Sequence, residues 1–386
     1  DAVTAGAPFA IVQRGKSIDA LTCVEVDDCD AALTAIGRHC RDRLATTLDG
    51  RVIGITGSVG KTSTKDLVLA VLRSKYANAH GPEKSLNNDI GVPVTIVNSP
   101  DSCEALVLEM GMRGLGEIAR LCDVGQPQIG VITEVGDAHS ERVGGIEGVV
   151  RAKAELLHSL PQSGIAIVNS DSVNAMKTVH SIAARVMTFG SSETAAVRWE
   201  IVSSDERGCC TVRFMAGNES AVGIVPLPGI HMASNAASAV AVGITCGIGI
   251  AQCVEALSNT QSASQRMQWV IGRNGIRILD DSYNANPVSV AAALRTVAET
   301  PAKQRYAVLG VMAEVLHSDL AHQEIAKLCE QLGIELLALE TGLYGTSALS
   351  LSDIANILNG HDSTTVVLVK GSRVAAAERV VQVLVV

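Results

Sequence analysis

Aromatic side chains and surplus positive charge are both scarce in this chain of 386 residues. It contains three Phe, four Tyr and two Trp, too few for the stacking platforms on which proteins hold single-stranded nucleic acid. Its 31 Lys and Arg residues are outnumbered by 40 Asp and Glu residues, which gives a formal net charge of −9. Because no basic surplus is available to neutralise phosphates, the composition argues against a nucleic-acid-binding protein.

Long apolar runs and paired cysteines are missing as well. Hydrophobic residues make up 47% of the chain, yet no run approaches the ~20 apolar residues that a membrane helix needs. The ten cysteines form no C-x-x-C pair, and the adjacent Cys209 and Cys210 have neither zinc-site spacing nor the geometry of an ordinary disulfide. We therefore expect reduced thiols that fill apolar space, in a cytoplasmic protein without a membrane span.

What the chain does contain is a repeated alternation of short apolar runs with helical stretches, which predicts an α/β protein. We expect a partial N-terminal α/β domain (1–48), a central domain with a doubly wound, mainly parallel sheet (49–262) and a smaller, Rossmann-like α/β domain (263–386). Residues 197–225 alternate in the manner of antiparallel strands, and the polar residues 258–264 are the expected linker. The expected parallel strands are 52–55, 105–108, 129–132, 165–168, 276–279, 306–309, 336–339 and 365–369.

A glycine-rich loop separates the first central strand from an amphipathic helix expected over 64–72. Such glycines let backbone N–H groups face phosphate oxygens, and the helix N-terminus adds positive potential, as in P-loop domains. We expect Lys61 to contact the terminal phosphates of a nucleotide and Thr62 to hold Mg²⁺. The spacing departs from the strict P-loop pattern because position 55 is Ile, so an ordinary strand-to-helix turn is the alternative. The loop comprises Thr56, Gly57, Ser58, Val59, Gly60, Lys61, Thr62 and Ser63.

Two later strands end in residues that suit a divalent cation. Glu109 follows the strand at 105–108, and His139 lies in the loop after the strand at 129–132. The carboxyl ends of parallel strands are where open α/β sheets bind ligands, so both residues are candidate metal ligands. A solvated carboxylate and a surface histidine are the alternatives. Lys153 lies in the helical stretch that follows, and its spacing alone indicates a solvated lysine.

Taken together, these stretches resemble the Mur ligases, most closely the branch that adds D-alanyl-D-alanine. Seven blocks occur in the family's order, and the resemblance runs from residue 1 to the C-terminus. Family members begin earlier, with a segment that helps to hold a uridine nucleotide, so we expect the front of the N-terminal UDP-substrate domain to be missing. The blocks are TGSVGKTS at 56–63, KSLNNDIGVP at 84–93, EMG at 109–111, GDAH at 136–139, RAKAE at 151–155, DDSYNANP at 280–287 and VKGSR at 369–373.

The resemblance implies an ATP-dependent amide ligase of peptidoglycan precursor synthesis, with ATP and Mg²⁺ as cofactors. Its substrates would be UDP-N-acetylmuramoyl-tripeptide and D-alanyl-D-alanine, joined through an acyl phosphate with release of ADP and phosphate. We expect a cytoplasmic monomer with no nucleic-acid partner.

The resemblance also implies a role for individual residues, each taken from the matching block. The implied catalytic residues are Lys61, His139 and Lys153, the last in carbamylated form. The implied metal ligands are Thr62, Glu109, His139 and Lys153. The implied nucleotide-binding residues, besides the loop, are Asn235, Arg266, Asp281 and Asn284. The implied substrate-binding residues are Asn87, Asn88, Lys370, Ser372 and Arg373.

Some positions depart from the family pattern and leave alternatives open. Met232 follows His231 where the family usually has Asn, Gln265 stands where it usually has Gly, and Leu-Gly is missing after Glu314. Another Mur ligase or a folylpolyglutamate synthase-like enzyme is a sister hypothesis. A P-loop kinase or signalling NTPase, and a non-catalytic truncated homologue that binds only ATP, belong to other classes. The third residue of the stem peptide stays open.

Overall fold

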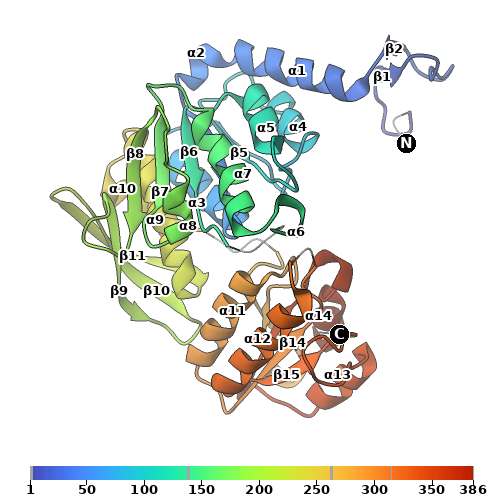
Figure 1. The fold of residues 1–386 in the computed structure, drawn as a ribbon, viewed down its shortest axis with the longest axis vertical. Helices are drawn as coiled ribbons and strands as arrows, with labels where there is room; N and C mark the ends of the chain where they lie inside the picture. Colours follow the sequence, from blue (N-terminus) through green and yellow to red (C-terminus); the bar gives the residue numbers. More distant parts are fainter. Residues whose placement is uncertain (1–2, 137–139, 261–263, 314, 386) are drawn as a thin grey trace.

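The computed structural model describes residues 3–136, 140–260, 264–313 and 315–385. They form three sheets of two, nine and five strands, arranged from one end of the molecule to the other (Figure 1). The structure is an α/β protein, as the alternation predicted. No helix formed by the described residues is long and apolar enough to cross a membrane.

The N-terminal part is small and lies on the outside of the central unit. Strands β1 (Ala10–Gln13) and β2 (Cys23–Val26) pair in parallel, and helix α1 (Cys29–Arg43) is followed by the short α2 (Ala45–Leu48). Asp28 caps α1 by accepting hydrogen bonds from two backbone N–H groups.

The nine-stranded sheet forms the centre of the molecule, in the order β11-β10-β9-β8-β7-β6-β3-β5-β4. Along this order, neighbouring strands from β9 to β4 run parallel. Strands β9, β10 and β11 pair antiparallel, as the alternation at 197–225 predicted. The strands are β3 (Val52–Thr56), β4 (Ala79–His80), β5 (Ala105–Glu109), β6 (Ile129–Ile132), β7 (Ile165–Asn169), β8 (Arg185–Gly190), β9 (Val197–Ser204), β10 (Cys209–Ala216) and β11 (Glu219–Pro228).

Helices cover both faces of this sheet because successive strand residues point to opposite sides. In β5, Val107 belongs to the core under α3 and α9, whereas Leu106 and Leu108 belong to the core under α5 and α7. Small side chains let α9 approach α3 closely, and a Cβ on Gly243 would lie 2.6 Å from Val71 Cγ1. The helices are α3 (Lys61–Arg73), α4 (Gly91–Val97), α5 (Glu117–Gly125), α6 (Ser140–Val143), α7 (Ile146–His158), α8 (Val173–Lys177), α9 (Ile230–Thr245) and α10 (Ile250–Ser258).

The five-stranded sheet builds the C-terminal unit, in the order β12-β13-β16-β14-β15. Its strands are parallel except β12, which the sequence did not predict. The expected linker is wrong at its first residue, because Ser258 still belongs to α10, and residues 261–263 lie outside the described residues. The elements are β12 (Gln268–Ile271), β13 (Arg277–Asp280), α11 (Pro287–Glu299), β14 (Gln304–Leu309), α12 (Ser318–Gln331), β15 (Glu335–Ala338), α13 (Leu351–Leu358), β16 (Thr365–Lys370) and α14 (Glu378–Val385).

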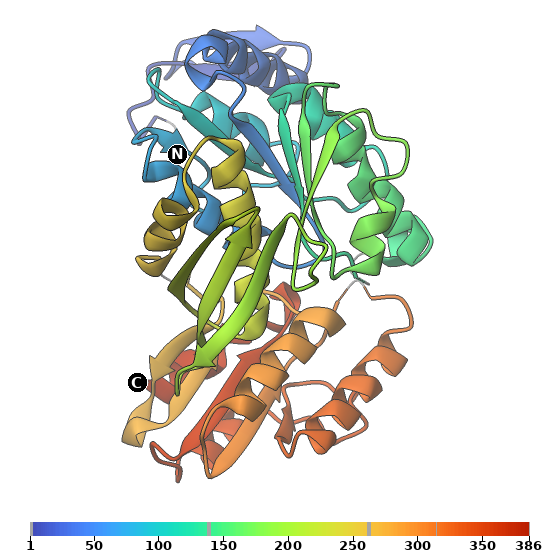
Figure 2. The same ribbon diagram turned by 90° about the vertical axis from the view of Figure 1, so that its left-hand side faces the viewer.

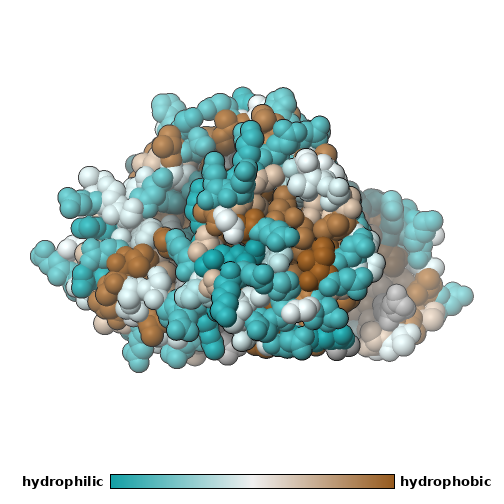
Figure 3. All heavy atoms as spheres, turned by 90° about the horizontal axis from the view of Figure 1, so that it is seen from below, coloured by the Kyte–Doolittle hydropathy of each residue, from teal (hydrophilic) through white to brown (hydrophobic). Residues whose placement is uncertain are grey.

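The central and C-terminal units touch through α11 and β12. Strands β9–β11 reach toward the C-terminal unit (Figure 2), where Trp269 Nε1 donates a hydrogen bond of 2.8 Å to the carbonyl of Arg207. Glycines permit the close approach of α11, since a Cβ on Gly229 would lie 2.6 Å from Thr296 Oγ1. Seen from the C-terminal end, apolar patches lie among hydrophilic side chains (Figure 3). Between the two units lies a cavity of about 1010 Å³.

Candidate active site

The glycine-rich loop lines this cavity at the point where β3 passes into α3. Neither glycine of the loop could carry a side chain without a steric clash. A Cβ on Gly57 would lie 1.9 Å from Thr133 Oγ1, and one on Gly60 would lie 2.7 Å from Asn235 Oδ1. Gly60 also has a φ of 85°, in the left-handed region. The backbone N–H of Ser58 donates to the carbonyl of Glu134 over 2.7 Å, which fixes the loop to the end of β6.

Lys61 is the first residue of α3 and lies across the loop. Its Nζ donates a hydrogen bond of 2.7 Å to the carbonyl of Gly57. Burial lowers the pKa of Lys61 from its ordinary value, and the nearby Glu109 opposes that shift. The ammonium group therefore stands at the helix N-terminus, where backbone N–H groups also favour an anion.

A chain of hydrogen bonds joins Thr62 to the end of β5. Thr62 Oγ1 donates to Glu109 Oε2 over 2.8 Å, and Asn87 Nδ2 donates to Glu109 Oε1 over 2.8 Å. Ser85 Oγ lies 2.9 Å from Thr62 Oγ1 and accepts a hydrogen bond of 2.9 Å from Arg266 Nη2. Because the Thr62 proton goes to Glu109, Ser85 is the donor to Thr62. Two hydroxyl oxygens and a carboxylate thus meet at one point, the hard oxygen donors that Mg²⁺ prefers.

Glu109 is 1% exposed, so the alternative of a solvated strand-end carboxylate is wrong. Ser85 was missing from the sequence prediction. It directly precedes the Leu86-Asn87-Asn88 block, but only the folded segment brings its hydroxyl to Thr62.

Lys153 lies on α7 and is 2% exposed, so the solvated lysine that its spacing indicated is also wrong. No hydrogen bond or ion pair joins its ammonium group to any of the residues that the structure describes. Burial, and then the positive charge of Lys61, hold the pKa of Lys153 well below its ordinary value. The side chain lines the same cavity as Lys61, Thr62 and Glu109.

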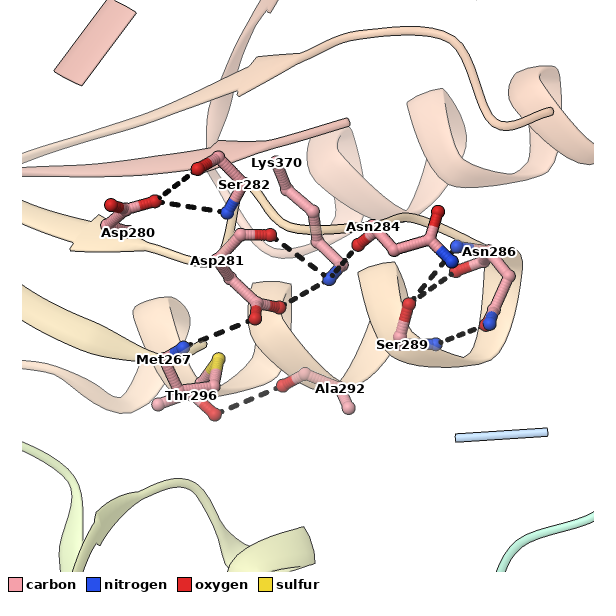
Figure 4. Close-up of polar contacts among 10 residues, drawn as sticks. All are labelled: Met267, Asp280, Asp281, Ser282, Asn284, Asn286, Ser289, Ala292, Thr296 and Lys370. Atoms are coloured by element: carbon pink, nitrogen blue, oxygen red, sulfur yellow. Dashed lines mark hydrogen bonds and ion pairs between the residues drawn. The ribbon is translucent and has the colours of Figure 1, made fainter. Parts of the chain in front are cut away.

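The C-terminal unit supplies a second group of charges, drawn in Figure 4. Lys370 Nζ forms an ion pair with Asp281 and donates a hydrogen bond of 2.8 Å to the carbonyl of Asn284. Asp281 Oδ1 also accepts a hydrogen bond of 3.2 Å from the backbone N–H of Met267. Both charged side chains are largely buried, and this pairing offsets the cost of removing them from water.

Two arginines stack on Tyr283 at the rim of the same cavity. The guanidinium carbons of Arg266 and Arg373 lie 4.0 and 5.3 Å from the centre of the tyrosine ring. Arg266 also contacts Ser85 of the central unit, so it bridges the two units. His231 lines the cavity opposite Asp281 and Lys370, and burial lowers its pKa to about 4.

The cavity brings together nearly all the residues that the sequence singled out. Thr56 and Gly57, the first two residues of the loop, are not among the residues that line the cavity, and His139 lies outside the described residues. Two of the candidate side chains form hydrogen bonds within the protein. The Asn88 side chain accepts hydrogen bonds from the N–H groups of Ile90 and Gly91, and Ser372 Oγ donates one to a backbone carbonyl. The predicted residues that line the cavity are Ser58, Val59, Gly60, Lys61, Thr62, Ser63, Asn87, Asn88, Glu109, Lys153, Asn235, Arg266, Asp281, Asn284, Lys370, Ser372 and Arg373.

Comparison with known proteins agrees with this geometry. Residues 55–243 match the Mur ligase middle domain, and residues 265–385 match the Mur ligase, glutamate ligase domain. The UDP-N-acetylmuramoyl-tripeptide–D-alanyl-D-alanine ligase of Mycobacterium tuberculosis is 34% identical over 345 residues, which cover 86% of this chain and 68% of that protein.

Solved structures share the fold over almost the whole chain. MurF from Acinetobacter baumannii superposes with a TM-score of 0.86 at 27% identity, covering 97% of this chain and 84% of that one. The MurF ligase from Thermotoga maritima in complex with ADP gives 0.85 at 25% identity, covering 99% and 89%. The chain therefore belongs to the Mur ligase family of ATP-dependent amide ligases.

Proposed function

We propose that this protein joins D-alanyl-D-alanine to UDP-N-acetylmuramoyl-tripeptide at the expense of ATP. The observation that carries the proposal is that one cavity is lined by the glycine-rich loop, the Thr62–Glu109 pair and the charged residues Asp281 and Lys370. A P-loop kinase would not need the second α/β unit to complete its site. The relatives named as D-alanyl-D-alanine ligases support the choice of substrates within the family.

The first step makes an acyl phosphate. An oxygen of the tripeptide carboxylate attacks the γ-phosphorus of ATP, an O–P bond forms, and the bond to the leaving ADP breaks. Negative charge on the phosphoryl oxygens is stabilised by Lys61 and by the backbone N–H groups of the loop. Asn235 and Asn284 are proposed to face the adenine, with Arg266 and Asp281 on the nucleotide across the cavity.

The residues around Thr62 fit a magnesium ion that also keeps phosphate and water oxygens as ligands. Thr62, Ser85 and Glu109 would hold it, and the ion would supply charge neutralisation at the phosphates. His139 is the proposed ligand of a second ion.

Lys153 is proposed to be carbamylated. A neutral amine attacks CO₂ to give a carbamate and a proton, and the lowered pKa of Lys153 favours the neutral amine. The product carries a negative charge, so it removes the repulsion between Lys153 and Lys61 and adds a carboxylate-like ligand to the cavity.

The second step forms the amide. The amine of D-alanyl-D-alanine attacks the acyl carbon, a C–N bond forms, the C–O bond to phosphate breaks and the amine loses a proton. Asn87, Asn88, Lys370, Ser372 and Arg373 are the proposed contacts of the two substrates. Enclosure between the two units would keep water from the acyl phosphate.

Phosphate release by the purified full chain tests this function. We expect release to require ATP, Mg²⁺, the UDP-linked tripeptide and D-alanyl-D-alanine together, with a drop of at least about 100-fold when the dipeptide is omitted. Tripeptides ending in meso-diaminopimelate and in L-lysine are assayed in parallel. Release without any amine would contradict the proposal, and ADP binding without ligation would favour a non-catalytic homologue.

A further inference from the structure

The segment from Gly81 to Asn88, here called the 81–88 segment, carries Ser85 and Asn87 to the Thr62–Glu109 pair. It leaves β4, an edge strand of only two residues, and ends at α4. At its far end Asn88 accepts from two N–H groups at the start of α4, and the carbonyl of Asn87 accepts from the N–H of Gly111 over 2.8 Å. The far end is therefore fixed to two elements of the central unit.

The near end is fixed by a buried lysine that the proposed chemistry does not use. Lys65 lies one turn after Lys61 on α3 and is 1% exposed. Its Nζ donates a hydrogen bond of 2.6 Å to the carbonyl of Pro82 and lies 2.7 Å from Asp66 Oδ1. Removing an ammonium group from water costs several kcal/mol unless it is paired. An uncharged side chain would fill this apolar space equally well. The buried ammonium group of Lys65 therefore indicates that its hydrogen bond to Pro82 matters.

The packing around Gly81 leaves the segment little freedom. A Cβ on Gly81 would lie 3.0 Å from Leu69 Cδ1 and 3.1 Å from the carbonyl oxygen of Val107, so the backbone passes tightly between α3 and β5. Pro82 is buried as well. Three residues beyond the carbonyl that Lys65 holds, Ser85 Oγ meets Thr62 Oγ1.

We propose that Lys65 is a positioning residue for the divalent cation: by holding Pro82 it sets where Ser85 meets Thr62 and Glu109. The inference rests on the proposed function, since it assumes that Mg²⁺ and a nucleotide occupy this part of the cavity. Residues that orient metal ligands change metal affinity by about 10–100-fold when they are lost. Lys65 does not contact the reacting atoms and acts only through the 81–88 segment.

Calorimetric binding of ADP, measured in Mg²⁺ and in EDTA, tests this role without turnover. We expect Lys65→Met to reduce the gain in ADP affinity that Mg²⁺ confers by about tenfold or more, while the affinity in EDTA stays within about twofold of wild type. Lys84→Met, an exposed lysine on the same segment, is the matched control and should keep the wild-type gain. Ser85→Ala should reduce the Mg²⁺-dependent gain in ADP affinity to a similar extent. In the double variant, Lys65→Met should change the gain that remains in Ser85→Ala by less than about twofold, because both substitutions act on the same contact.

Gly81→Ala gives a second route if Lys65→Met does not fold, because its Cβ would press on the carbonyl oxygen of Val107 and crowd the segment without touching the ammonium group; the same loss is expected. The inference would be overturned if Lys65→Met or Gly81→Ala kept the wild-type gain in ADP affinity on adding Mg²⁺. It would also be overturned if either variant lost equal ADP affinity in Mg²⁺ and in EDTA, or if the double variant lost the product of the two single losses. A wild-type protein without Mg²⁺-dependent ADP binding would overturn the proposed function itself, and so the two failures are distinguishable.

Discussion

Lys61→Ala is expected to lower the turnover number for ADP formation by about 10²–10³-fold. The Lys61 ammonium group is held at the N-terminus of α3, where it faces the space that the phosphates of a nucleotide would enter. Because Lys61 is proposed to stabilise charge that grows in the transition state, its loss should appear mainly in kcat rather than in KM. Coupled ADP release at saturating substrates measures the effect.

A matched variant separates this effect from a general loss of positive charge. Lys75, just beyond the end of α3, is exposed and donates a hydrogen bond to the carbonyl of Gly247, far from the loop. Lys75→Ala should leave kcat within about twofold of wild type. If Lys61→Ala retained more than a third of wild-type turnover, the glycine-rich loop would not be the phosphate site.

Lys153→Ala is the second variant with a large expected effect, a loss of about 100-fold or more in kcat. The carbamate needs a neutral amine, and an ordinary lysine, with a pKa of about 10.4, is almost fully protonated at neutral pH. Since the folded protein lowers the pKa of Lys153, its neutral form persists to lower pH than that of an exposed lysine. Carbamylation of Lys153, and the activity proposed to depend on it, should therefore persist to lower pH than carbamylation of an exposed lysine, and fall as the amine becomes protonated.

Carbon-13 NMR in labelled bicarbonate reports the modification directly. The wild type should show a carbamate resonance that is absent from Lys153→Ala, and depletion of CO₂ should lower its activity reversibly. Lys177→Ala, which removes an exposed lysine paired with Glu147, is the control and should keep both the resonance and the activity. A fully active Lys153→Ala variant would show that this buried lysine has no part in the reaction.

The sequence predicted the strands that contain a continuous apolar run. The apolar runs at 129–132 and 365–369 became β6 and β16, in which every residue is buried. It missed the six-residue β8, which mixes charged, polar and apolar side chains, and the short edge strands β2, β4 and β12, whose partly exposed residues lack a continuous apolar run. Short edge strands of this kind are stabilised by their partner strand rather than by their own composition.

In the candidate site too, some residues could be predicted from the sequence and others only from the fold. The glycine-rich loop and Glu109 could be predicted from local order, because each follows a buried strand and brings polar residues to its end. Lys153 looked solvated by spacing, and only the packing of α7 shows that it is buried. Ser85 and Lys65 could not be singled out from the sequence, because the roles proposed for them depend on how the 81–88 segment crosses α3 and not on any pattern within it.

Transfer of labelled oxygen tests the central claim, ligation through an acyl phosphate, most directly. The UDP-linked tripeptide is labelled with ¹⁸O in its reacting carboxylate and turned over with ATP and D-alanyl-D-alanine, and the released phosphate is analysed by mass spectrometry. The carboxylate oxygen that attacks phosphorus leaves with the phosphate when the amine displaces it. We predict one ¹⁸O atom in each phosphate released. Unlabelled phosphate, formed at the same rate with or without the dipeptide, would contradict the mechanism.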